Sequence, residues 1–187
     1  MILKKYFYNR DTLSVAQDLL GCHLTRKIGN RIFRGMITEV EAYIGEDDLA
    51  CHASRGRTPR TEIMYGKAGR AYVYMIYGMY HCLNIVTERK NFPAAVLIRS
   101  VKIKDIDHKK TDGPGKLCRF LKIDRGLNDF DMTAGKKLWI TCPKNIRQIR
   151  KHLAVEKSKR IGVDYAGRCR HHLWRFHMDP TTAKYSA

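Results

Sequence analysis

The sequence is short of acidic residues, of proline and of long apolar runs. Asp and Glu number 18 against 36 Lys and Arg, and five prolines occur among 187 residues. No apolar run approaches the roughly 18 residues that signal a membrane span. The opening residues run directly into charged side chains, without the apolar segment of a secretory signal behind them. We therefore expect a protein without a membrane partner that stays in the cytoplasm.

Closely spaced cysteines are also missing. The six cysteines lie at least 24 positions apart, which excludes a local zinc knuckle or C-x-x-C redox motif. A metal site built from distant Cys and His side chains stays open, but small buried thiols are the simpler interpretation. We expect no metal and no cofactor. The cysteines are Cys22, Cys51, Cys82, Cys118, Cys142 and Cys169.

What the sequence has is apolar content and positive charge. Hydrophobic residues make up 44% of the chain, enough for a packed core. The formal net charge of +18 repels itself unless a polyanion compensates it. Nucleic acid is the commonest polyanion; an anionic membrane surface and compositional drift are the alternatives. From Lys144 to His177 ten Lys and Arg stand against Glu156 and Asp164, and we expect this stretch to follow a nucleic-acid backbone.

The apolar and turn residues predict a single α+β domain over residues 1–187. A capped helix is expected from Asn9 to Leu20, closed by Gly21, and a second one from Gly113 to Leu121. Residues 45–68 are expected to be loop with at most one helical turn. The segments typical of strands span residues 23–28, 32–43, 70–76, 80–87, 94–103 and 138–141. We expect a mainly antiparallel sheet with a few helices.

A local reversal of charge stands out, because the ten residues from Glu39 to Asp48 carry five carboxylates. On a strand, Glu39, Glu41 and Tyr43 share one face. Such a face is either a solvated edge or the wall of a site. In a site, partial burial raises the pKa of a glutamate and suits it to take a proton from water. These residues by themselves leave both interpretations open.

Four tyrosines fall within the nine residues from Tyr72 to Tyr80. Tyr77 stands before Gly78 at the expected tip of a protruding hairpin, where a large exposed ring gains nothing for folding. In a basic protein such a ring is well shaped to wedge between base pairs. The β-propensity of tyrosine explains Tyr72 and Tyr80 adequately and Tyr77 less well.

A set of short motifs follows in order from about Phe7 to Phe176. They are Glu41-Ala-Tyr43, His52, Arg55-Gly-Arg-Thr-Pro-Arg60, Tyr72-Val-Tyr74, Tyr77-Gly-Met79, Asn84, Val96-Leu-Ile-Arg99, Gly113-Pro-Gly-Lys-Leu-Cys118 and Arg160-Ile-Gly-Val163. The ordered set resembles the alkyladenine (3-methyladenine) DNA glycosylase family, in its mammalian-type class rather than the helix-hairpin-helix class. The resemblance implies a curved, barrel-like sheet flanked by helices. It also implies a monomeric, monofunctional DNA N-glycosylase of base-excision repair, which would work at the nucleoid in a bacterium.

The resemblance implies a substrate and a reaction. The substrate would be double-stranded DNA containing alkylated or deaminated purines, and the damaged nucleotide would be flipped out of the stack. Glu41 would activate the water that attacks the sugar C1′, leaving an abasic site. Arg99 would help to hold this water and the phosphate of the flipped nucleotide; a strand-end salt bridge is its alternative role.

The resemblance also assigns residues to the base and to the gap it leaves. The flipped base would lie between Tyr43 on one side and His52 and Tyr74 on the other. Tyr77 would intercalate into the duplex from the minor groove. Asn84 would crowd the exocyclic amino group of guanine and so select against it; a plain strand-end asparagine is the alternative.

Three points stay open from the sequence. Lys116, after Gly113-Pro-Gly, meets either a DNA phosphate or solvent. The loop Gly66-Lys-Ala-Gly69 replaces a proline-rich apolar loop usual in bacterial relatives, which leaves the substrate range open. The function itself has two competitors: a lesion-binding DNA protein without catalysis, against which Glu41 argues, and an RNA-binding protein with a preference for single strands.

Overall fold

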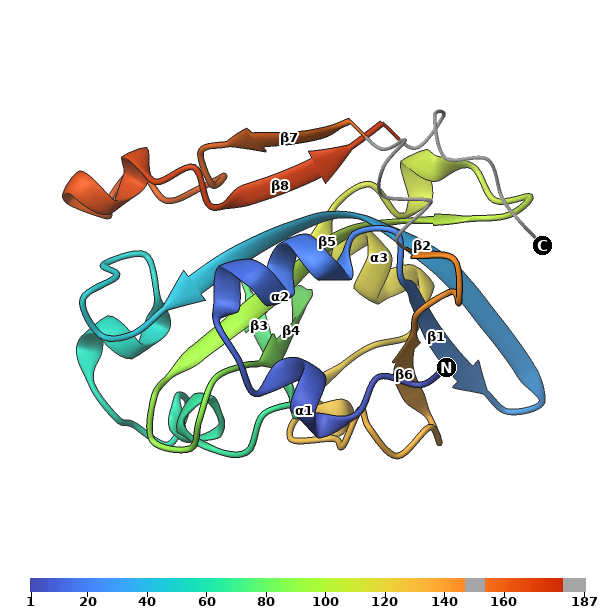
Figure 1. The fold of residues 1–187 in the computed structure, drawn as a ribbon, viewed down its shortest axis with the longest axis horizontal. Helices are drawn as coiled ribbons and strands as arrows, with labels where there is room; N and C mark the ends of the chain where they lie inside the picture. The colour runs from blue at the N-terminus through green and yellow to red at the C-terminus, as the bar shows by residue number, and fades with distance from the viewer. Residues whose placement is uncertain (147–153, 180–187) are drawn as a thin grey trace.

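The protein is built around an eight-stranded antiparallel sheet (Figure 1). The computed structural model describes residues 1–146 and 154–179. The main strand order is β3-β4-β5-β2-β1-β6, and β8 pairs with both β2 and β7. The strands are β1 (His23–Ile28), β2 (Arg31–Ile44), β3 (Ala71–Ile76), β4 (Tyr80–Val86), β5 (Ala94–Ile103), β6 (Leu138–Thr141), β7 (Val155–Ser158) and β8 (Arg175–Met178). The curled sheet with few helices confirms the expected α+β class.

Strand β2 is the central strand of the sheet, because three other strands, β1, β5 and β8, pair with it. Along one edge it pairs with β1 over its first half and with β8 at Glu39–Glu41, while β5 runs along the other edge. Gly35 permits the close approach of β5, since a Cβ there would lie 2.8 Å from the Ile103 side chain. Strand β2 is therefore paired along both edges, so the alternative that its carboxylates, Glu39 and Glu41, belong to a solvated edge is wrong.

Helices cover the sheet where their apolar faces point inward. Helix α2 (Thr12–Leu19) starts at Asp11, whose carboxylate accepts the Ser14 N–H at 2.8 Å, and it packs on β2 and β5. Helix α3 (Pro114–Phe120) has proline in its first turn and packs on β4 and β5. Both helices confirm the sequence expectation. A short helix, α1 (Lys5–Tyr8), was not expected.

Short elements account for most other differences from the expectation. The segment 45–68 holds two 3-10 helices, η1 (His52–Arg55) and η2 (Glu62–Tyr65), where at most one helical turn was expected. Three more are η3 (His108–Lys110), η4 (Arg125–Leu127) and η5 (Gly167–His171). The sequence analysis also missed β7 and β8, because their residues include too few apolar side chains to form the run that marks β6.

The basic side chains after Lys144 do not form one continuous exposed surface. Its residues 147–153 lie outside the described part of the chain. Arg160 is buried and Arg175 is ion-paired with Glu39, so the expectation that these side chains follow a polyanion is wrong. The exposed members, such as Arg168 and Arg170, still fit that expectation.

Candidate active site

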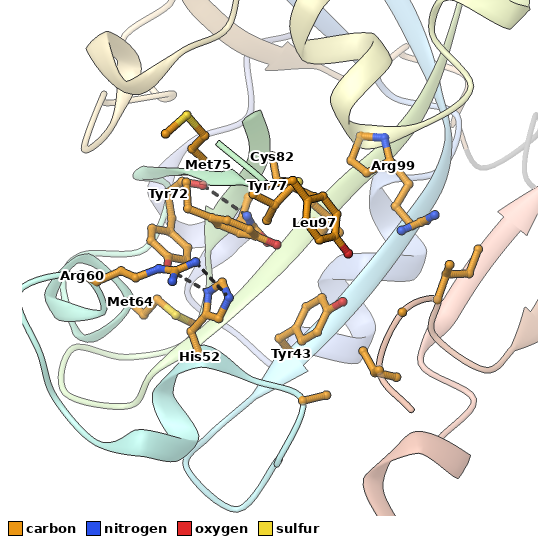
Figure 2. A pocket seen from close by; sticks show the side chains of 18 of the residues that line it. Tyr43, His52, Arg60, Met64, Tyr72, Met75, Tyr77, Cys82, Leu97 and Arg99 are labelled. Carbon is orange, nitrogen blue, oxygen red and sulfur yellow. Dashed lines mark hydrogen bonds between the residues drawn. The ribbon is translucent and has the colours of Figure 1, made fainter. Parts of the chain in front are cut away.

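A cavity of about 550 Å³ opens between the β3–β4 hairpin, the end of β2, the middle of β5 and the loop that follows Lys159 (Figure 2). Six of the eight predicted site residues line it: Tyr43, His52, Tyr74, Tyr77, Asn84 and Arg99. The loop 66–69 does not line it. The structure therefore gathers residues from positions 43 to 165 of the chain around one space.

Glu41 lies directly beneath the cavity wall and is completely buried. Its Oε2 accepts the Tyr43 hydroxyl at 2.8 Å, and its Oε1 accepts the backbone N–H of Ile161 at 2.8 Å. Arg99 Nη1 lies 3.4 Å from Oε1. Burial raises the pKa of Glu41, against the lowering influence of Arg99 and the two hydrogen bonds. The result is a carboxylate that is held in place yet more basic than one in water.

Arg99 reaches Glu41 because of an irregularity in the β2–β5 ladder. Glu39 pairs with Ser100 while Val40 pairs with Ile98, so Arg99 is left out of the register. Such bulges redirect a side chain, and here the Arg99 guanidinium also donates from Nε to Glu39 Oε1 at 2.8 Å. The strand-end salt bridge that the sequence left open for Arg99 thus exists, in addition to its place at the cavity.

A second arginine holds Glu39 from the opposite side. Arg175 on β8 donates from Nε to the same Oε1 of Glu39 at 2.6 Å. Although burial would raise the pKa of Glu39, Arg99 and Arg175 together lower it, so Glu39 is ionised. Charges of alternating sign therefore run from Glu41 through Arg99 and Glu39 to Arg175. Sequence reasoning missed Arg175, because nothing local indicates its partner 136 positions away.

His52 and the two tyrosines of β3 form an aromatic wall of the cavity. The rings of His52 and Tyr74 meet edge to face with centroids 4.5 Å apart, and His52 Nδ1 lies 2.9 Å from the Tyr72 hydroxyl. Arg60 Nη2 lies 3.3 Å from His52 Nε2. A guanidinium can only donate, so Nε2 accepts and the proton of the neutral ring is on Nδ1. Figure 2 shows Tyr43 projecting toward this wall from a different strand.

The charge state of His52 follows from its surroundings. Burial, and then the positive charges of Arg60 and Arg55, lower its pKa to about 4. The ring is therefore neutral at pH 7, so the rings of the aromatic wall carry no charge themselves. Arg60 was quoted only as part of a motif, and its contacts with His52 and, at 5.3 Å, with the Tyr74 ring show that it belongs to this wall.

A buried ion pair fixes the loop that reaches Glu41. The Arg160 guanidinium binds both carboxylate oxygens of Asp48, at 2.5 and 2.7 Å, and both side chains are buried. The same guanidinium lies 4.8 Å from the centre of the Tyr43 ring. It thereby positions Ile161, the next residue, whose N–H binds Glu41. Three of the five carboxylates in the stretch from residue 39 to 48, namely Glu39, Glu41 and Asp48, are thus paired with arginines.

Tyr77 lines the cavity from the tip of the β3–β4 hairpin. It is 85% exposed, and its neighbours Met75 and Met79 are exposed too. Its φ is +51° and that of Gly78 is +68°, the pair of positive values that marks type I′ turns. A side chain in this region costs about 1–2 kcal/mol, so the tip holds a strained, solvent-exposed aromatic ring.

The remaining two predicted residues differ in placement. Asn84 is buried in the cavity wall, and its amide donates to the Tyr72 carbonyl at 3.2 Å. Lys116 is exposed on α3 and pairs with Asp112 at 2.7 Å. Lys116 is not among the residues that line the cavity, although Pro114 of the same helix is.

Neither residues 1–146 nor 154–179 contain three or more His, Cys, Asp or Glu side chains grouped so that they could hold a metal ion. In the same ranges, every helix is too short or too polar to cross a membrane.

Comparison with known proteins gives a consistent result. The family described as methylpurine-DNA glycosylase matches residues 6–182. A protein of Sodalis glossinidius named "Putative 3-methyladenine DNA glycosylase" is 50% identical over 176 residues, which cover 94% of this chain and 95% of that protein. Proteins with the same name are similar in Methanocella arvoryzae (44% identity, 94% of this chain, 92% of that protein) and Clostridium perfringens (40%, 95% and 96%).

Proposed function

Because the chain belongs to the methylpurine-DNA glycosylase family, we propose that it is a DNA glycosylase of base-excision repair that removes damaged purines from double-stranded DNA. It flips an alkylated or deaminated purine nucleotide into the cavity and hydrolyses the N-glycosidic bond, leaving an abasic site. It acts as a monomer without metal or cofactor. Residues 1–187 form one glycosylase domain. The described strands share a single sheet, which supports this assignment.

The observation that carries this proposal is the buried carboxylate of Glu41 at an aromatic cavity. Its Oε1 already faces the Ile161 N–H and Arg99, whereas Oε2 accepts only the Tyr43 hydroxyl. A carboxylate oxygen can accept two hydrogen bonds, so Oε2 keeps an acceptor position that a water molecule would fill. The raised pKa makes Glu41 a stronger base for a proton of that water.

The reaction depends on stabilising the positive charge that develops on the sugar. As the purine leaves, C1′ becomes positively charged, and the negative carboxylate of Glu41 stabilises it. The water that Glu41 activates adds to C1′ and gives its proton to the carboxylate. Arg99 lines the cavity with N–H groups beyond those bound to Glu39, which can hold the phosphate of the flipped nucleotide.

The aromatic walls supply the binding of the base. Tyr43 would stack on one face, and His52 with Tyr74 would contact the other. Some alkylated purines carry positive charge, and tyrosine faces attract a cation by about 0.5–2 kcal/mol. Asn84 in the wall crowds the 2-amino group of guanine, so undamaged guanine is disfavoured.

Flipping needs a group that takes the place of the extruded base. Tyr77 is the side chain suited to it, because it is exposed, aromatic and displayed on a tight turn beside the cavity mouth. The strain at its φ supports a functional role, since an exposed ring there brings no packing. The charge of +18 would hold the duplex through its phosphates.

Hydrolysis by water, rather than by a covalent amine intermediate, is supported by the lining of the cavity. No lysine occurs among the cavity-lining residues of the described chain. The enzyme is thus proposed to be monofunctional, releasing the base without cutting the strand.

Single-turnover excision on duplexes with one lesion each tests the proposal. The lesions are hypoxanthine, 3-methyladenine, 7-methylguanine and ethenoadenine. We expect Glu41→Gln to lose about 10²- to 10⁴-fold in rate while its affinity for the damaged duplex is retained. If wild-type protein binds these duplexes but releases none of the bases, the lesion-binding alternative is correct.

A further inference from the structure

Two cysteines face each other at the edge of the sheet, far along the chain from one another. Cys22 immediately precedes β1 and Cys142 immediately follows β6. The antiparallel register pairs His23 with Thr141, so Cys22 and Cys142 are the next opposed positions. Their Sγ atoms lie 2.7 Å apart across 120 positions of sequence.

This distance is shorter than an ordinary contact between side chains, which is roughly 3.5–4.0 Å for non-bonded heavy atoms. Opposed residues in antiparallel strands have Cα atoms about 4.5–5.5 Å apart. Disulfides need a Cα separation of about 4.4–6.8 Å. The backbone therefore already places the two thiols where a bond between them requires little movement.

The two thiols differ in exposure in a way that suits stepwise oxidation. Cys142 is partly exposed, whereas Cys22 is buried and its thiol also faces the Asp18 carbonyl at 3.3 Å. The other four cysteines are all buried. A small oxidant in solution therefore reaches Cys142 first, with Cys22 held in contact behind it.

We propose that Cys22 and Cys142 are a disulfide-forming pair that hydrogen peroxide oxidises, joining β1 covalently to the edge strand β6. The Cys142 sulfur attacks a peroxide oxygen, the O–O bond breaks, and sulfenic acid and one water form. The Cys22 sulfur then attacks the Cys142 sulfur and displaces the hydroxyl group, which leaves as water with the Cys22 proton. Two thiols and one peroxide give one disulfide and two waters.

The bond would add a covalent link to a short strand at the end of the sheet order. Strand β6 has four residues and lies at the end of the sheet order. Cys142 also exchanges backbone hydrogen bonds with Met1, at 3.0 and 3.1 Å, so the bond would secure the N-terminal segment as well. A cross-link that spans 120 positions removes many conformations of the unfolded chain. Neither cysteine lines the cavity, so base excision by the folded protein should not change.

The test is peroxide treatment of the whole protein followed by tryptic digestion without reductant. Trypsin places Cys22 in the peptide 11–26 and Cys142 in the peptide 138–144. We expect one linked species of these two peptides, lighter than their sum by two hydrogen atoms and split by a thiol reductant. The oxidised protein should melt about 5–10 °C higher than the reduced protein and keep its activity.

Matched variants distinguish a specific bond between Cys22 and Cys142 from unspecific oxidation of the cysteines. Cys142→Ala and Cys22→Ala should each abolish the linked species and the gain in melting temperature, whereas Cys118→Ala on α3 should preserve both. Peptide mapping of the wild-type protein does not depend on how well the variants fold. The proposal is overturned if Cys142 is consumed by peroxide without a link to the peptide 11–26, or if it links mainly to another cysteine.

Discussion

The backbone N–H of Ile161 donates to Oε1 of Glu41 at 2.8 Å and joins two residues 120 positions apart. This contact exists because the neighbouring Arg160 is anchored on Asp48. The loop that holds the proposed base is therefore anchored by an ion pair whose two residues do not line the cavity.

Replacing Arg160 tests that dependence. Arg160→Met leaves the buried carboxylate of Asp48 without its partner, and we expect a loss of about 3–5 kcal/mol in the free energy of unfolding. The double variant with Asp48→Asn should recover part of this loss, because no uncompensated charge remains. Urea denaturation of the four proteins in the cycle measures the coupling. Additive effects would mean that the pair contributes little to the fold.

Glu39→Gln tests whether Glu39 acts as a positioning residue. Its negative charge raises the pKa of Glu41, and its carboxylate holds Arg99. Removing the charge should lower the pKa of Glu41, so the acidic limb of the pH–rate profile should move to lower pH while the maximal rate falls. Single-turnover excision across pH measures both. The matched control is Glu62→Gln, an exposed glutamate paired with Arg57, and a similar shift in that variant would contradict the role of Glu39.

Tyr77→Gly separates function from folding at the hairpin tip. Glycine relieves the positive φ but adds freedom to the unfolded chain, so stability should change by less than about 1 kcal/mol. Excision from duplex DNA should still fall, by on the order of 10- to 100-fold, because the group that fills the gap is gone. Melting temperature and single-turnover rate are measured side by side. A large loss of stability would mark Tyr77 as a structural residue.

The lowered pKa of His52 predicts how stability depends on pH. Its folded-state value is about 4 against an ordinary 6.5, so the unfolded chain binds the proton more readily. Stability should thus decrease as pH falls from 6.5 toward 4, by at most about 1.4 kcal/mol per unit for this group. His23, whose pKa burial also lowers to about 4, adds to the same trend. His52→Phe should make the decrease less steep between pH 7 and 5, as measured by urea denaturation; an unchanged slope would contradict the assignment.

Salt dependence of binding tests Lys116 as a phosphate contact. The logarithm of the binding constant should fall by about 0.9 per logarithmic unit of salt for each phosphate contacted. Lys116→Ala should reduce this slope by about one contact if the lysine leaves Asp112 for DNA. The control is Lys27→Ala, because Lys27 lies on β1 and does not line the cavity. Equal slopes for wild type and Lys116→Ala would place Lys116 in solvent.

The sequence predicted the long elements because their patterns are local. The apolar runs of the strands, the Gly21 that closes α2 and the glycine-proline start of α3 each act within a few positions. The strands β7 and β8 have four residues each; β8 pairs with β2 and β7 pairs with β8, and these pairings depend on contacts that no local pattern carries.

The same distinction holds for the site. Tyr43, His52 and Arg99 were found through motifs that resemble a family, and the structure gathers them around one cavity. Arg175 and the ion pair of Arg160 with Asp48 were missed, because their partners lie more than a hundred positions away. The bulge that redirects Arg99 is also a product of strand pairing rather than of the residues beside it.

The late position of β8 along the chain has a consequence for biosynthesis. Ile161, which binds Glu41, is made 120 residues after it, and Arg175, which binds Glu39, is made 136 residues after Glu39. A chain truncated before Arg160 would thus carry the aromatic hairpin without the contacts that hold the Glu41 carboxylate in place.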